Sequence, residues 1–172
     1  TDIRGTAIEK DGKAIDLTDT VVADIVNSLV VFLKNKLSKS ELKIAVGYDS
    51  RVSSPRIADC VCNTLSALGV EVYRSGLSST PSMFMSVVNF NMDASVEITA
   101  SHLPMEMNGL KFFTREGGFS GNDIKEILAY AENNAFKSNN FMCVDNDNYV
   151  YDFRLDSLSL ARGVGIGHLP DD

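Results

Sequence analysis

Apolar positions in the first part of the chain follow helical spacing and then strand spacing. Between residues 21 and 33 apolar side chains recur every three or four positions, and Thr18 or Asp19 can cap the helix that this pattern predicts. The run LKIAVGYD then indicates a short buried strand. In the following SSPRIADCVCNTLSALG, Ser53 or Ser54 can act as N-cap, proline suits the first turn, and glycine ends the predicted helix.

The middle of the chain repeats this alternation of strands and helices. VEVYRSG and ASVEITA predict strands, and STPSMFMSVVNF between them predicts a helix with a Ser/Thr-Pro start. GLKFFT predicts a fourth strand, and NDIKEILAYAEN predicts a further helix with Asn122 as its cap. We therefore predict a three-layer α/β/α domain with a mixed, mainly parallel four-stranded sheet and helices on both of its faces.

The regular pattern ends near residue 132. Residues 133–172 begin as a polar stretch that is typical of a linker, and DNDNYVYD within it is expected to be solvated. We accordingly assign residues 1–132 to one domain, and residues 133–172 to a linker with an atypical tail.

Composition and charge exclude several classes of function. The chain has 172 residues, of which 44% are hydrophobic, and its net charge of -7 leaves no clustered cations for binding a nucleic acid. The stretch VVADIVNSLVVFL is interrupted by polar residues, which favours a core helix over a membrane span. Cys60 and Cys62 lie within one predicted helix, so they do not indicate a disulfide framework. We expect a cytoplasmic protein without nucleic-acid or membrane partners, and an organellar targeting peptide ahead of Thr1 stays open.

Two polar loops, GYDSRVSSP and TASHLP, follow predicted strands. Ligands bind beyond the carboxyl ends of parallel strands, so both loops are expected at the functional edge of the sheet. Ser101 and His102 do not by themselves indicate a hydrolase, because neighbouring residues point to opposite sides and the G-x-S-x-G motif is absent. From the residues alone a turn serine is the simpler interpretation. Asp49 and Arg51 are interpreted as a structural ion pair that holds their own loop, and Ser54 as a helix start.

Four motifs in order, DIRG, GYDSRVSSP, TASHLP and NGLKFF, closely resemble the first domain of the alpha-D-phosphohexomutases, the phosphoglucomutase/phosphomannomutase family. The resemblance covers most of residues 1–132 and identifies this segment as domain I. It implies that Ser101 is the phosphoserine, and that Arg4 and Lys111 lie near it as phosphate-binding and proton-transfer cations. It also implies that His102 contacts substrate or phosphate.

Pro104, Asn108 and Gly109 are expected to set the shape of the TASHLP loop, with Gly109 adopting a backbone conformation that other residues avoid.

The resemblance further implies an activity and its cofactors. The family interconverts hexose 1-phosphate and hexose 6-phosphate, glucose or mannose, through a bisphosphorylated intermediate. Mg²⁺ is expected to bind through the phosphate of Ser101, with hexose 1,6-bisphosphate as activator. The family's D-G-D-G-D-R metal loop does not occur in this sequence, so we expect the remaining ligands in other mutase domains and little activity from this chain alone. The alternative is a non-catalytic phosphosugar-binding or interaction module derived from the same fold.

Overall fold

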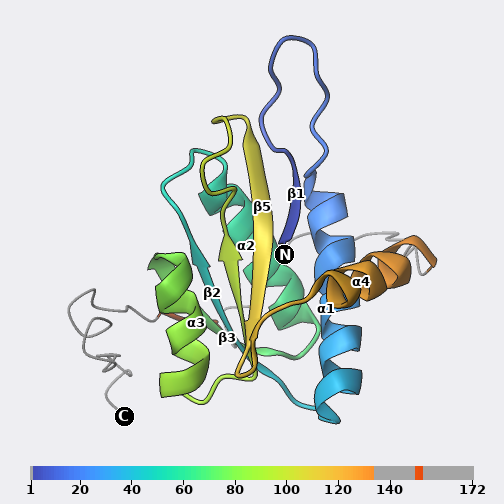
Figure 1. The fold of residues 1–172 in the computed structure, drawn as a ribbon, viewed down its shortest axis with the longest axis vertical. Helices are drawn as coiled ribbons and strands as arrows, with labels where there is room; N and C mark the ends of the chain where they lie inside the picture. Colours follow the sequence, from blue (N-terminus) through green and yellow to red (C-terminus); the bar gives the residue numbers. More distant parts are fainter. Residues whose placement is uncertain (1, 134–149, 153–172) are drawn as a thin grey trace.

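The fold of the chain is a single sheet with helices on both faces (Figure 1), and the computed structural model describes residues 2–133 and 150–152. The strand order is β1-β5-β4-β2-β3-β7, with β6 paired to β5. The strands are β1 (Asp2–Thr6), β2 (Lys43–Tyr48), β3 (Glu71–Leu77), β4 (Ala94–Ile98), β5 (Met107–Thr114), β6 (Gly117–Gly118) and β7 (Val150–Asp152). The helices are α1 (Asp19–Leu37), α2 (Ser54–Ala67), α3 (Thr80–Asn89) and α4 (Gly121–Asn133).

Apolar side chains on both faces of the sheet form two cores. The larger core joins α1, α2 and α4 to one face, and it includes Phe112 of β5. The neighbouring Phe113 points to the other face, where it packs in a smaller core with Met83 and Val87 of α3. The predicted α/β/α layering is therefore confirmed.

The sheet is mixed, as predicted, but it has more strands than expected. β2 pairs in parallel with β3 and β4, and β7 pairs in parallel with β3. β5 is antiparallel to β4, β1 and β6. The prediction of four strands was wrong because β6 and β7 are too short to show a two-residue period, and because DIRGT was noticed only as a motif.

Val150–Asp152 does not fit the prediction of a solvated linker, since these residues form β7 beside β3. The rest of the predicted linker and tail, residues 134–149 and 153–172, lies outside the described residues.

The helix starts follow their local sequences. Thr18 caps α1 by accepting a hydrogen bond from the amide of Val21, as predicted. The expected cap of α4 was wrong: Ser120 takes that place instead of Asn122. The amide of Asp123 donates to Ser120 Oγ, and the amide of Ser120 donates to the Asp123 carboxylate.

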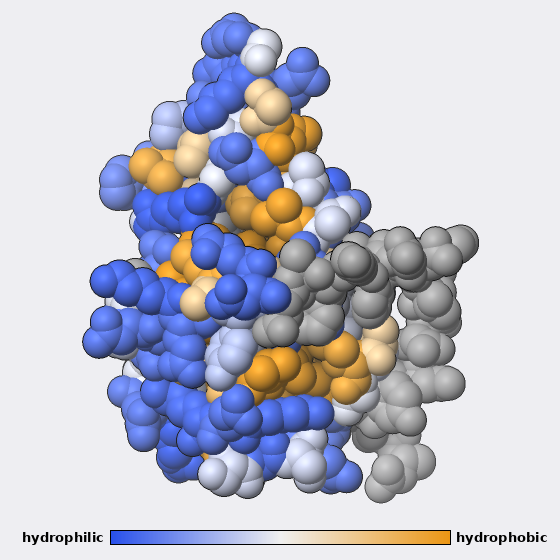
Figure 2. All heavy atoms as spheres, turned by 90° about the vertical axis from the view of Figure 1, so that its right-hand side faces the viewer, coloured by the Kyte–Doolittle hydropathy of each residue, from blue (hydrophilic) through white to orange (hydrophobic). Residues whose placement is uncertain are grey.

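The segment between β1 and α1, residues 7–18, projects beyond the sheet as a long loop (Figure 1). Lys10 at its far end forms an ion pair with Glu106, 3.1 Å away, so the projecting loop reaches the loop between β4 and β5. Figure 2 shows its tip as mainly hydrophilic. Within the described ranges, none of the helices has the length and apolar character needed to cross a membrane.

Candidate active site

The two polar loops lie side by side because β2 and β4 are parallel neighbours in the sheet. The first loop follows β2 at Asp49, and the second follows β4 at Thr99. The amide of Asp49 donates to the carbonyl oxygen of Ile98 at 3.0 Å, which joins the loops where they begin. The predicted position of both loops at the carboxyl edge of the parallel strands is confirmed.

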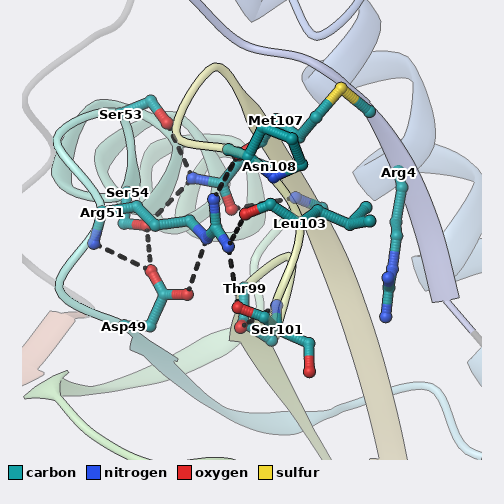
Figure 3. A network of polar contacts seen from close by, with 12 residues as sticks. Arg4, Asp49, Arg51, Ser53, Ser54, Thr99, Ser101, Leu103, Met107 and Asn108 are labelled. Atoms are coloured by element: carbon teal, nitrogen blue, oxygen red, sulfur yellow. Dashed lines mark hydrogen bonds and ion pairs between the residues drawn. The ribbon is translucent and has the colours of Figure 1, made fainter.

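Ser101 lies at the exposed turn of the second loop. Its φ of 58° is in the left-handed region, which residues with a side chain seldom adopt. The amide of Ser101 donates to Thr99 Oγ1 at 3.0 Å, and this bond supports the turn. The Ser101 side chain points away from the surrounding hydrogen bonds (Figure 3). Its hydroxyl is thus presented on a turn whose backbone is fixed.

Arg51 from the first loop holds the second loop through its guanidinium group (Figure 3). Its Nη2 donates to the carbonyl oxygens of Ser101 and Leu103, both at 2.7 Å. Its Nη1 donates to the carbonyl oxygens of Pro104, at 2.7 Å, and Met107, at 3.1 Å. A guanidinium group has several N–H donors in one plane and can therefore bond to several carbonyl oxygens at once. The single ammonium group of a lysine could not make all of these hydrogen bonds.

A second set of contacts fixes Arg51 itself. Asp49 Oδ2 lies 3.2 Å from Arg51 Nε, and the Asp49 carboxylate accepts a hydrogen bond from Ser54 Oγ at 2.7 Å. Asn108 Nδ2 donates to Ser53 Oγ at 2.8 Å and to Ser54 Oγ at 2.9 Å. The predicted ion pair between Asp49 and Arg51 is confirmed. The hydrogen bonds from Arg51 to the Ser101 loop were not predicted.

Arg4 and Lys111 lie on the same face of the sheet, on the neighbouring strands β1 and β5. Asp2 is directly opposite Lys111, and Arg4 is directly opposite Gly109, two residues along β5. Residues two apart on a strand share a face, so the two predicted cations are diagonal neighbours. Arg4 has a side chain that is 28% exposed and forms an ion pair with Asp2 at 2.7 Å.

Gly109 is required by close packing, which corrects the reason given from the sequence. Its φ is not among the positive values, so no unusual backbone conformation is involved. A Cβ at this position would instead lie 2.5 Å from the carbonyl oxygen of Ile3 and 2.9 Å from that of Thr99. It would also lie 3.0 Å from Cγ of Arg4, so the glycine leaves room for the Arg4 side chain across β5.

Glu97 is a buried carboxylic acid that the sequence analysis did not single out. It lies in β4 with an exposed fraction of 1%, and Ser78 Oγ donates to its Oε2 at 2.9 Å. The pKa of Glu97 is raised to about 7, mainly by burial and also by the charge of Asp49, while the hydrogen bond from Ser78 and the charge of Lys111 act in the opposite direction. The signal that could have revealed Glu97 is a lone acid within the apolar run ASVEITA.

His102 is exposed beside Ser101, at the predicted place in the loop. Over residues 2–133 and 150–152, the structure contains no group of three His, Cys, Asp or Glu side chains placed to hold a metal ion. The described residues do not by themselves complete a metal site.

Comparison with known proteins places this fold in a family. The chain is 36% identical over 91 residues to a phosphoglucosamine mutase from Caldicellulosiruptor saccharolyticus, covering 53% of this chain and 20% of that protein. It is 32% identical over 124 residues to a phosphomannomutase from Vibrio cholerae, covering 70% of this chain and 26% of that protein. The chain thus spans between a fifth and about a quarter of these curated relatives.

A solved structure shows the same fold. The phosphoglucomutase/phosphomannomutase family protein from Burkholderia thailandensis superposes with a TM-score of 0.62 at 22% identity, over 90% of this chain and 32% of that one. The family model described as phosphoglucomutase/phosphomannomutase, alpha/beta/alpha domain I, matches residues 1–138. The chain therefore belongs to the phosphoglucomutase/phosphomannomutase family, of which it forms the α/β/α domain I.

Proposed function

We propose that this chain is the phosphoserine-bearing domain of an enzyme that interconverts hexose 1-phosphate and hexose 6-phosphate through a bisphosphorylated intermediate. The observation that carries the proposal is the presentation of Ser101. Its hydroxyl is exposed on a turn that Arg51 fixes through backbone carbonyl groups, at the carboxyl edge of the sheet. Phosphoryl transfer depends mainly on such positioning and on nearby charge.

Each proposed site residue has a role in one transfer. A hydroxyl oxygen of the hexose phosphate attacks the phosphorus on Ser101, and the bond between phosphorus and Oγ breaks. The proton of the attacking hydroxyl ends on the serine oxygen, with Lys111 as the proton-transfer group. Arg4 offers the free edge of its guanidinium to phosphate oxygens, and His102 contacts substrate or phosphate. In the second transfer, the Ser101 oxygen attacks the phosphorus at the other position of the bisphosphorylated sugar. The bond between that phosphorus and the sugar oxygen breaks, the sugar oxygen takes up the proton, and phosphoserine is regenerated.

Two cofactors are part of the proposal, a hexose 1,6-bisphosphate and Mg²⁺. Hexose 1,6-bisphosphate supplies the phosphoryl group that primes Ser101. Mg²⁺, when bound to the serine phosphate, offsets the negative charge that moves during transfer. Its other ligands, and the groups that bind the distal phosphate of the sugar, belong to the remaining mutase domains of a longer protein.

Two questions can be answered by simple observations: which sugar phosphate is the substrate, and whether the protein is an enzyme or a non-catalytic module. Relatives of this chain are named as phosphoglucosamine mutase and phosphomannomutase, so glucosamine, mannose and glucose phosphates are the substrates to compare. The alternative is a non-catalytic phosphosugar-binding or interaction module. A longer reading frame that encodes D-G-D-G-D-R favours the enzyme, and its absence favours the module.

A coupled assay tests the proposed function on two forms of the protein. We expect the longest gene product that contains this chain to turn over at least one of the three hexose phosphates. We expect the 172-residue chain alone to be slower by at least about a thousandfold, because it lacks the metal ligands and the distal phosphate site. Turnover by the short chain close to that of the long product would show a self-contained active site and contradict the proposal, as would an inactive long product.

A further inference from the structure

Glu97 is a titratable group that the transfer described above does not use, yet the surrounding residues form a defined environment for it. Its carboxylate is buried and accepts the hydrogen bond from Ser78, which lies between β3 and α3. Gly47 of β2 leaves the space for this pair. A Cβ there would lie 2.0 Å from Ser78 Oγ and 3.0 Å from Glu97 Oε2. The position of the Glu97 carboxylate is therefore set by three separate segments of the chain.

Lys111 is the cross-strand neighbour of Glu97. The two residues are directly opposite each other on β4 and β5, and Asp2 is directly opposite Lys111 on β1. Directly opposite residues share a face of the sheet, with Cβ atoms about 5 Å apart. The stem of Lys111 thus starts between two carboxylates. Asp2 already pairs with Arg4, and within residues 2–133 Lys111 forms no direct ion pair, so the attraction between Lys111 and Glu97 acts across the two strands.

The other elements around Glu97 supply little that could replace Lys111. Helix α3 covers this face of the sheet and contains no Asp, Glu, Lys or Arg. Asp49, at the end of β2, adds a second negative charge near Glu97, and Lys111 supplies the opposing positive one. Burying a carboxylate without a cation is costly, so this arrangement gives Glu97 and Lys111 a mutual dependence.

We propose that Glu97 is a positioning residue for Lys111: the carboxylate fixed by Ser78 and Gly47 attracts the lysine ammonium across the β4–β5 strand pair. This inference rests on the proposed function for the role of Lys111 in proton transfer. Asp2, Lys111, Glu97 and Gly47 are directly opposite one another on four neighbouring strands. In this arrangement Asp2 orients Arg4, and Glu97 orients Lys111.

An NMR titration of the Glu97 side-chain carboxyl carbon in the 172-residue chain tests the pairing. We expect Lys111→Gln to raise the pKa of Glu97 above its value in the wild-type protein, because the attracting charge is gone. The matched control is Lys125→Gln, which removes an exposed lysine from α4 on the other face of the sheet and should leave the titration unchanged. A Glu97 titration that Lys111→Gln does not alter would overturn the inference.

Kinetics of Glu97→Gln in the longest gene product test the consequence for catalysis. Glutamine keeps an oxygen that can accept from Ser78 but removes the charge. We expect kcat to fall by on the order of tenfold with KM nearly unchanged, and the pH dependence of kcat to shift. Wild-type kcat and pH dependence in this variant would overturn the positioning role. The titration needs no turnover, so it distinguishes a failure of this pairing from a failure of the proposed mutase activity.

Discussion

Replacing Arg51 with alanine is expected to lower the free energy of unfolding of the chain by about 3 to 5 kcal/mol. The side chain of Arg51 is only 12% exposed, and its loss removes the donors to four carbonyl oxygens, three in the loop after β4 and one at the start of β5. It also leaves Asp49 without its cation. The same loss would free the backbone of Ser101, whose left-handed conformation needs support from its surroundings.

Urea unfolding and amide hydrogen exchange measure the two parts of this result. A matched control is Arg56→Ala, which removes an arginine of α2 that is 39% exposed and pairs with Asp19 at the surface, and which should cost less than about 1 kcal/mol. Arg51→Lys should recover only part of the loss, because one ammonium cannot reach all four carbonyl oxygens. A change below about 1 kcal/mol for Arg51→Ala, with unchanged exchange at residues 99–107, would contradict the assigned role.

Replacing Glu97 with glutamine is expected to stabilise the chain at pH 8 by an amount that approaches about 3 kcal/mol, and to have little effect at pH 4. The pKa of Glu97 is raised to about 7 from 4.5 by burial, so the folded state retains a proton that the unfolded state has already lost. The contribution of Glu97 to the free energy of unfolding therefore decreases as the pH rises from about 4.5 to about 7, and above that range its ionisation destabilises the fold by the full amount. Glutamine does not titrate and avoids the loss.

The measurement is the difference in unfolding free energy between Glu97→Gln and the wild-type chain across this pH range. Taking the difference cancels the carboxylates that titrate in both proteins, among them Asp16 and Asp123, whose pKa values are lowered by hydrogen bonds. A difference that stays constant with pH would show that Glu97 is ionised without penalty. A more stable but slower variant would mean that the buried charge is retained for function at a cost in stability.

The sequence allowed the layered fold to be predicted because its signals are local. Thr18 and Ser79 begin their helices with side-chain hydrogen bonds a few residues away, and the apolar periods of α1 and α2 are long enough to be unambiguous. β1 was missed because five residues with a charged Arg4 near their centre show no clear alternation. β7 was missed because its partner β3 lies more than 70 residues earlier, and pairing at that distance leaves no local pattern.

The candidate site was predictable only as far as its motifs extended. The motifs pointed to Arg4, Ser101 and Lys111, and the sheet register places Arg4 and Lys111 on one face of the sheet. Arg51 was assigned to its own loop because its four carbonyl partners lie 50 to 56 residues away in the sequence. Glu97 was overlooked because the role of an acidic residue within a strand cannot be inferred until its cross-strand neighbour, here Lys111, is known.

The central claim is that Ser101 carries the phosphoryl group, and phosphopeptide mass spectrometry tests it most directly. The longest gene product would be incubated with hexose 1,6-bisphosphate and cleaved after glutamate, which releases residues 98–106 with only two hydroxyl side chains, Thr99 and Ser101. We expect the phosphate on Ser101, removed by an excess of hexose monophosphate, and no labelled peptide from Ser101→Ala. Phosphate on Thr99 or on another peptide, or full turnover by Ser101→Ala, would contradict the account.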